Sequence, residues 1–210
     1  EMAKNMDISL GTVNGLVKEC LAEGYIAEEE NGKEKYLILL DKGKELLKPY
    51  KVDGALIIAA GFGSRFVPLT FETPKGLLEV FGERMIERQI KQLHEVGIHD
   101  ITIEVGYLKE KFEYLIDKYD VKLLYNPEYS CKNTLATVYR ARKFLKGRNV
   151  LILSSDNWMR ENMYHSYECG AWYSAAHEEG ETKEWCLTFN KKGRISDVNV
   201  GGKDAWFMYG

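Results

Sequence analysis

Two glycines, an arginine and a lysine follow one short apolar segment of this 210-residue chain and could together hold a triphosphate group. Gly61 and Gly63 would let main-chain N–H groups approach phosphate oxygens, because neither residue carries a Cβ. Arg65 and Lys75 add the positive charge that a loop of amides lacks. Pro74 fixes the backbone directly before Lys75 and would help to aim its ammonium group. These residue types at this spacing predict a site for a nucleoside triphosphate.

This loop differs from the two most familiar phosphate-binding loops. Phe66 occupies the position of the third glycine in the dinucleotide fingerprint Gly-x-Gly-x-x-Gly, so that fingerprint is excluded. A Walker A loop is excluded as well, because no Gly-Lys-Ser/Thr closes the segment. A lone Gly-x-Gly after a strand is also compatible with a tight structural turn, and that alternative stays open at this point.

The elements that must position these residues alternate between strand and helix. The uninterrupted apolar segment 55–60 predicts a strand that is covered on both faces. An amphipathic helix that ends at Gly97 is predicted by five apolar residues at helical spacing, Met85, Ile86, Ile90, Leu93 and Val96. We expect further strands over 100–105, 121–125 and 149–154, and helices over 109–118 and 133–145. This order predicts an α/β fold, with a mostly parallel sheet and helices on both faces.

The segment AAGFGSRFVPLTFETPKGLL resembles the signature of the nucleotidyltransferases that activate phosphorylated small molecules. Three further segments are most similar to the bacterial CTP:phosphocholine cytidylyltransferases: IERQI, GYLKEKFEYLIDKYDVKLLYNPEYS and KEWCL. The similarity extends over about 52–210. It implies a Rossmann-like nucleotidyltransferase domain in which the glycine loop wraps the triphosphate of CTP, while Arg65 and Lys75 neutralise it.

A divalent metal is expected at the site, because the attacking phosphate and the triphosphate repel each other. Asp156 follows the predicted strand 149–154, and open α/β sheets bind their ligands at the carboxyl ends of strands. Magnesium usually takes one or two carboxylates together with waters and phosphate oxygens, so Asp156 could anchor it. The alternative is that Asp156 caps the next turn. The resemblance implies a second acidic ligand, which the sequence does not locate.

Aromatic residues in the last third of the chain are candidates for recognising choline. A quaternary ammonium donates no ordinary hydrogen bond, so its site needs aromatic faces with a carboxylate nearby. We predict the cage at Trp185 and Trp206, although tryptophans also fill cores. The predicted substrate-binding residues are Trp158, Tyr173, Glu184, Trp185, Asp204 and Trp206, and Trp172 and Tyr209 lie in the same segment.

The nucleotide base is expected against the loop 126–134, which precedes a predicted helix. Short polar side chains there could read the edge of a pyrimidine, while the end of the first strand approaches from the other side. Asn133 is equally suited to cap the helix. The predicted nucleotide-binding residues are Ala59, Ala60, Gly61, Gly63, Ser64, Arg65, Lys75, Asn126 and Thr134.

Residues 1–51 predict a separate small module before the nucleotidyltransferase domain, 52–210. Ser9 can cap a helix that runs to Glu23, and 25–40 predicts a hairpin around Asn31-Gly32. This order resembles the second half of a winged helix-turn-helix domain. The acidic residues 28–30 would repel DNA, so we favour an interaction or dimerisation module over nucleic-acid binding.

Composition excludes further classes. The net charge of −3 gives no general electrostatic reason to bind nucleic acid. No apolar segment is long enough to span a bilayer, and neither end reads as a signal peptide. The cysteines indicate neither a zinc site nor a disulfide framework, because Cys-x-x-Cys spacing is absent from Cys20, Cys131, Cys169 and Cys186. We therefore expect a cytoplasmic protein without contact to membranes.

The sequence predicts a member of the CTP:phosphocholine cytidylyltransferases that uses Mg²⁺ and makes CDP-choline and pyrophosphate. Its predicted catalytic residues are Lys75, Arg65 and Asp156. One alternative is a sugar-1-phosphate nucleotidyltransferase, and another is a ligand-responsive DNA-binding regulator built on an inactive transferase fold. We expect the domain to be incomplete at its C-terminus. A homodimer and a fused choline kinase domain are compatible with the resemblance.

Overall fold

The computed structural model describes residues 2–6, 8–32 and 34–209. The chain divides into two compact units, Glu1–Lys51 and Val52–Gly210. No helix in the described part of the chain is long and apolar enough to cross a membrane.

The first unit contains the helix and the hairpin that the sequence predicts. Its elements are α1 (Met2–Asn5), α2 (Leu10–Ala22), β1 (Ile26–Asn31), β2 (Glu34–Leu39), α3 (Asp41–Leu47) and η1 (Lys48–Tyr50). The Ser9 side chain accepts a hydrogen bond from the Thr12 N–H at 3.1 Å, so it caps α2 as predicted. β1 and β2 are antiparallel, with Asn31 paired to Glu34 as expected for the predicted hairpin, and position 33 lies outside the described residues. The resemblance to a winged helix stays a prediction.

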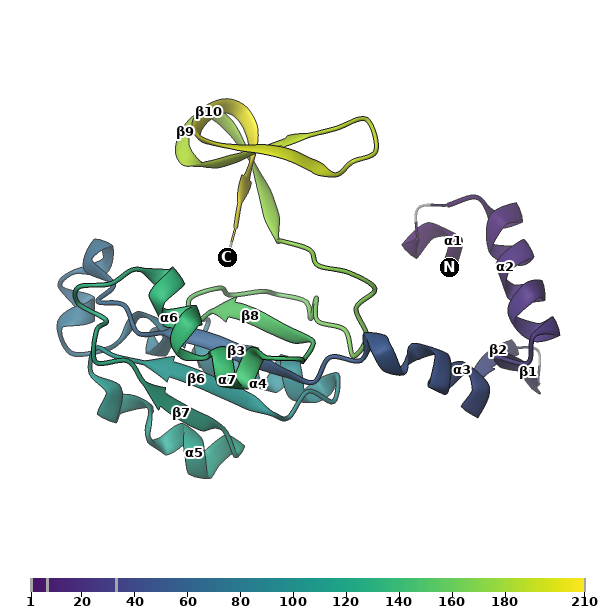
Figure 1. Ribbon diagram of the computed structural model, residues 1–210, viewed down its shortest axis with the longest axis horizontal. Coiled ribbons are helices and arrows are strands. Elements are labelled where there is room, and N and C mark those ends of the chain that lie inside the picture. Colours follow the sequence, from purple (N-terminus) through teal and green to yellow (C-terminus); the bar gives the residue numbers. More distant parts are fainter. Residues whose placement is uncertain (1, 7, 33, 210) are drawn as a thin grey trace. The chain divides into compact units, whose positions relative to one another are not determined.

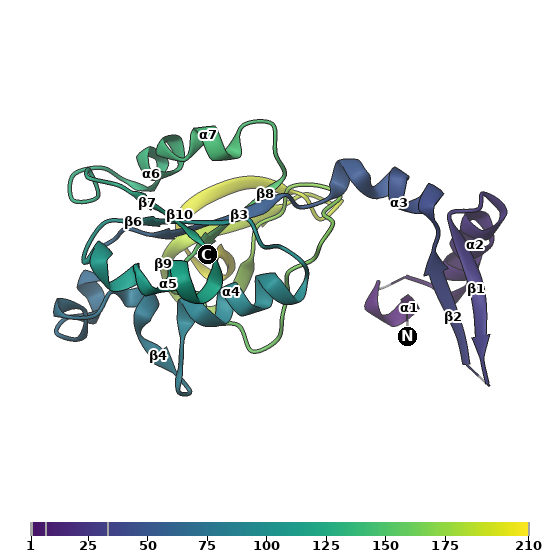
Figure 2. The same ribbon diagram turned by 90° about the horizontal axis from the view of Figure 1, so that it is seen from below.

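A four-stranded parallel sheet forms the centre of the second unit and confirms the predicted fold class. Its strands are β3 (Gly54–Ala59), β6 (Ile101–Val105), β7 (Lys122–Tyr125) and β8 (Val150–Ser154), in the order β7-β6-β3-β8. Seen along the sheet, α4 (Met85–Glu95) and α5 (Tyr114–Tyr119) lie on one face, and α6 (Thr134–Arg140) and α7 (Arg142–Leu145) lie on the other (Figure 2). The main apolar core fills the α4 face, where alternate residues of β3 and β6 pack against the apolar side of α4.

A buried glutamate links α4 to α5. Glu87 accepts hydrogen bonds of 2.7 Å from the Tyr114 hydroxyl, the Lys118 ammonium and the Tyr119 hydroxyl. Burial alone would raise the pKa of this carboxyl, but these three donors outweigh it and lower the pKa to about 2. Glu87 is therefore ionised at neutral pH and stabilises the packing of α5 on α4.

Two predicted helices are not continuous. The segment 109–118 begins as a 3-10 turn, η5 (Lys109–Phe112), and becomes α-helical only in α5. The segment 133–145 is divided at Ala141 into α6 and α7. Apolar spacing cannot distinguish short 3-10 turns or breaks from a continuous α-helix, because both geometries bring residues three or four positions apart onto one face.

The sequence analysis missed two antiparallel strand pairs. One is the small pair β4 (Glu79–Val80) and β5 (Glu83–Arg84). The other is the long twisted hairpin of β9 (Ala175–Phe189) and β10 (Ile195–Met208) (Figure 1). Asn190 and Gly193 form its turn, where the Asn190 side chain accepts the Lys192 N–H at 2.8 Å and Gly193 has a φ of 71°. The segment NKKG was therefore the available signal for this hairpin.

Candidate active site

A cavity of about 420 Å³ lies where β3 and β8 end. Carboxyl ends of parallel strands are where open α/β sheets bind their ligands. Most of the predicted nucleotide and catalytic residues line it together, although they come from four separate stretches of sequence: Ala59, Ala60, Gly61, Gly63, Ser64, Arg65, Lys75, Thr134 and Asp156.

The glycine loop forms one side of the cavity. Gly63 has a φ of 64°, and a Cβ there would lie 3.0 Å from Thr70 Cγ2, so this position needs glycine. The buried Thr70 hydroxyl donates to the Gly63 carbonyl at 3.0 Å and fixes the loop from behind. Gly61 differs, because a Cβ there would have no neighbour within 4 Å. Packing therefore does not require glycine at position 61, and close approach of a phosphate to this residue stays a prediction.

Lys75 is positioned by a close approach of two backbone segments. It begins the turn η4 (Lys75–Leu77), directly after Pro74. A Cβ on Gly76 would lie 2.8 Å from the Ser155 side chain, so only glycine lets this turn approach the end of β8. The Lys75 ammonium hydrogen-bonds to Asp156 and lies 4.5 Å from the centre of the Phe66 ring. Sequence analysis missed Gly76, Thr70 and Phe66 as supporting residues.

Asp156 is held as an anion. Its carboxylate accepts hydrogen bonds from Lys75 and from the Ser154 hydroxyl. Burial alone would raise the pKa of this carboxyl, but the two hydrogen bonds and the charge of Lys75 hold it below its usual range. An ionised oxygen donor facing the cavity suits Mg²⁺. Among the described residues, no group of three or more acidic, histidine or cysteine side chains could hold a metal ion. The second acidic ligand that the resemblance implies stays a prediction.

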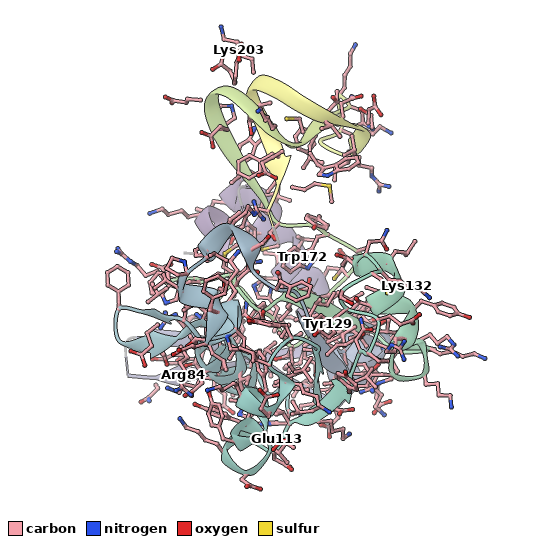
Figure 3. All side chains as sticks on the ribbon, turned by 90° about the vertical axis from the view of Figure 1, so that its left-hand side faces the viewer. Arg84, Glu113, Tyr129, Lys132, Trp172 and Lys203 are labelled. Atoms are coloured by element: carbon pink, nitrogen blue, oxygen red, sulfur yellow. The ribbon has the colours of Figure 1, made fainter. Side chains whose placement is uncertain are left out.

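The opposite wall comes from the loop before α6 and from α6 itself. Tyr129 packs on Gly106, where a Cβ would lie 2.6 Å from the Tyr129 Cβ, and its ring lies 5.2 Å from the Phe62 ring of the glycine loop. Lys132 also lines the cavity and is paired with Glu128 at 2.6 Å (Figure 3 labels Tyr129 and Lys132). Neither residue was predicted for the site, although an aromatic and a basic residue in a polar loop were the available signals.

Two polar residues of this wall have structural roles. Asn133 lines the cavity and caps α6 by accepting the Ala136 N–H at 3.4 Å. Asn126, a predicted nucleotide ligand, is 2% exposed and does not line the cavity. Its side chain donates to the Thr137 hydroxyl at 3.1 Å and accepts the Glu128 N–H at 3.0 Å. Asn126 therefore supports the wall from behind.

None of the predicted substrate-binding residues, all of which the structure describes, lines the cavity. These residues are Trp158, Tyr173, Glu184, Trp185, Asp204 and Trp206. Trp158 packs against Phe81, and the Arg88 guanidinium lies 4.8 Å from its ring. Trp185 and Trp206 are 56% and 48% exposed on the hairpin β9–β10, which also carries Lys203 (Figure 3). Asp204 accepts the Gly180 N–H at 2.8 Å within the same hairpin. The choline cage at Trp185 and Trp206 stays a prediction.

Comparison with known proteins finds a matching family model and several similar proteins. Residues 54–179 match the family model described as nucleotidyl transferase. The choline-phosphate cytidylyltransferase of Streptococcus pneumoniae is 37% identical over 156 residues, which are 74% of this chain and 67% of that protein. The 2-aminoethylphosphonate cytidylyltransferase of Lancefieldella rimae is 36% identical over 74% of this chain and 64% of its own length. A solved structure of the CTP:phosphocholine cytidylyltransferase LicC from S. pneumoniae superposes with a TM-score of 0.71, covering 75% of this chain and 68% of that one.

Proposed function

Because the chain belongs to the nucleotidyl transferase family, we propose that it transfers the cytidylyl group of CTP to phosphocholine. The observation that carries the proposal is the meeting of the glycine loop, Lys75 and Asp156 at one cavity. The support for cytidine and for a choline-type acceptor is the 37% identity to a choline-phosphate cytidylyltransferase.

In the proposed reaction, a phosphate oxygen of phosphocholine attacks the α-phosphorus of CTP in line. The bond from that phosphorus to the bridging oxygen breaks, and pyrophosphate leaves with the bonding electrons. Main-chain N–H groups at Gly61 and Gly63, together with Arg65, would bind the β- and γ-phosphates. Lys75 would stabilise the charge that spreads over the α-phosphate in the transition state, so catalysis rests on positioning and electrostatics.

Nucleotidyltransferases of this kind generally use Mg²⁺, and Asp156 is the residue that would hold it in this chain. When bound, the metal would neutralise phosphate charge and so reduce the repulsion between the two substrates. The hydrogen bond from Lys75 helps to lower the pKa of the Asp156 carboxyl, and it places both side chains at the same part of the cavity.

We propose that residues outside this cavity select the acceptor, because the described candidates for acceptor binding do not line it. Relatives of similar identity are named for choline phosphate and for 2-aminoethylphosphonate, so a small cationic phosphate or phosphonate is the shared chemistry. Trp185 and Trp206 have exposed rings that could receive a quaternary ammonium, which supports phosphocholine.

The experiment is an assay of pyrophosphate release. Each nucleoside triphosphate is offered with phosphocholine, phosphoethanolamine, 2-aminoethylphosphonate or glucose-1-phosphate, with and without Mg²⁺. We expect release only with CTP, phosphocholine and Mg²⁺ together. Preference for glucose-1-phosphate would refute the acceptor, and preference for another nucleoside triphosphate would refute the cytidylyl donor.

A further inference from the structure

Glu104 is a buried glutamate that the proposed reaction does not use. It is 0% exposed and lies on β6, whose alternate residues Ile101, Ile103 and Val105 belong to the core on the α4 face. Because successive side chains of a strand alternate, Glu104 faces the other side, which α6 and α7 cover (Figure 2). Its register partner on β3 is Ile58, which lines the cavity.

The carboxyl group of Glu104 has no hydrogen-bond partner of normal geometry among the described residues. Burial raises its pKa to about 7, against smaller opposing effects from Arg140 and from the nearby Asn126 amide. Its register neighbours on β3 and β7 are the apolar Ile58 and Leu124, so Arg140 on α6 is the charged residue that acts on it.

Arg140 is also incompletely paired. One end of its guanidinium donates to Glu128 at 2.6 Å, while its Nε is buried and has no partner in the described part of the chain. A buried acceptor and a buried donor are each unfavourable when left unpaired. Contact between an ionised Glu104 and the Nε of Arg140 would satisfy both groups.

Two paths connect this pair to the cavity wall. Asn126, beside Glu104, donates to Thr137, which lines the cavity. Glu128 binds Arg140 and also Lys132, which lines the cavity as well. A change in the charge of Glu104 would therefore reach both α6 and the loop that precedes it.

We propose that Glu104 is a positioning residue for the nucleotide, whose ionised carboxylate binds Arg140 and thereby fixes α6 and the loop 126–133 as one wall of the cavity. This role rests on the proposed binding of a nucleotide there. Above neutral pH the carboxylate is ionised and the wall is held for the nucleotide. Below neutral pH the Glu104 carboxyl is protonated and Arg140 retains only its hydrogen bond to Glu128. The nucleotide then binds more weakly.

The test is the pH dependence of CTP binding, measured by calorimetry from about pH 6 to about pH 8 on the wild type and on Glu104→Gln. The CTP phosphates titrate in both proteins, so the ratio of the two dissociation constants is compared. We expect the wild type to gain roughly fivefold or more over the variant as pH rises. A ratio that stays constant would overturn the proposal, because a purely structural role would weaken binding equally at every pH.

Two further variants keep the test decisive. Thr102→Val changes the same face of the same strand and should retain the wild-type profile. Arg140→Gln removes the partner of Glu104 and should lose the pH-dependent gain, even if Glu104→Gln does not fold. An Arg140→Gln protein with the wild-type profile would also overturn the proposal. If another nucleoside triphosphate binds in place of CTP, the same comparison with that nucleotide tests Glu104 separately from the choice of CTP.

Discussion

Lys75 and Asp156 lie 81 positions apart in the sequence and hydrogen-bond to each other at the cavity. The two side chains are equally exposed, at 23% each. The contact joins the turn after the glycine loop to the end of β8, so two of the three predicted catalytic residues belong to one local arrangement.

Replacing Lys75 by alanine should lower turnover by roughly a hundredfold or more, because it removes a positive charge aimed at the reacting phosphates. The unfolding temperature should change little, since this side chain lies outside the apolar core. Pyrophosphate release and thermal melts measure the two effects. Lys109→Ala is the matched control, because the Lys109 ammonium lies 4.1 Å from the centre of the Tyr125 ring and does not line the cavity. Near-normal turnover of Lys75→Ala would remove Lys75 from the mechanism.

Asp156→Asn should weaken CTP binding only when Mg²⁺ is present, because the amide keeps the shape of the side chain and removes the charge that would hold the metal. Calorimetry with Mg²⁺ and with a chelator separates the two conditions. Asp117→Asn, on the exposed side of α5, is the control and should bind as the wild type does. Equal loss of affinity in both conditions would show that Asp156 acts through Lys75 and not through a metal.

Gly61→Ala should reduce CTP affinity by roughly tenfold, through loss of a close contact between the loop and a phosphate. Its thermal stability should stay near that of the wild type, because an added Cβ has no neighbour within 4 Å. Gly76→Ala is the contrasting variant, in which the new Cβ lies 2.8 Å from Ser155 and should disturb both stability and the position of Lys75. Unchanged CTP affinity in Gly61→Ala would mean that the phosphates do not approach this residue.

Trp185→Ala and Trp206→Ala should raise the KM for phosphocholine and leave that for CTP nearly unchanged. A cation–π contact contributes roughly 0.5 to 2 kcal/mol, which corresponds to about a twofold to thirtyfold change. Phenylalanine at either position should cause a smaller change, because an aromatic face remains. Trp172→Ala tests an exposed tryptophan outside the hairpin. Wild-type kinetics in both alanine variants would exclude these two rings from the acceptor site.

Glu87→Gln should lower the free energy of unfolding at neutral pH by about 1 to 3 kcal/mol, because a charged acceptor of three hydrogen bonds is lost. The folded pKa of about 2 lies below the ordinary value of 4.5, so this stabilisation is complete above pH 4.5 and is lost as pH falls toward 2. Denaturant titrations should therefore show a smaller difference between variant and wild type in acid than at neutral pH. A difference that is independent of pH would assign the effect to packing alone.

The sequence by itself determined the parallel sheet and most of the residues that line the cavity, because both depend on recognisable local patterns. Uninterrupted apolar segments mark buried strands, and Gly61, Gly63 and Lys75 follow the first of them within twenty residues of sequence. Asp156 was predictable because parallel strands bring their carboxyl ends to one edge of the sheet, whatever their separation in the chain.

Only the tertiary structure decided which residues support the cavity and which predicted residues lie away from it. Gly76 has a role because a distant serine lies against it, and Asn126 is buried because α6 packs over it. The sequence places Glu104 in a strand but does not show whether its side chain is buried. Only the packing of α6 on that face of the sheet shows that the carboxyl group is buried and without a hydrogen-bond partner among the described residues. These features arise from contacts between segments that are far apart in the chain. Such contacts bury polar groups and so change their free energy, and the local spacing of residues does not encode this effect.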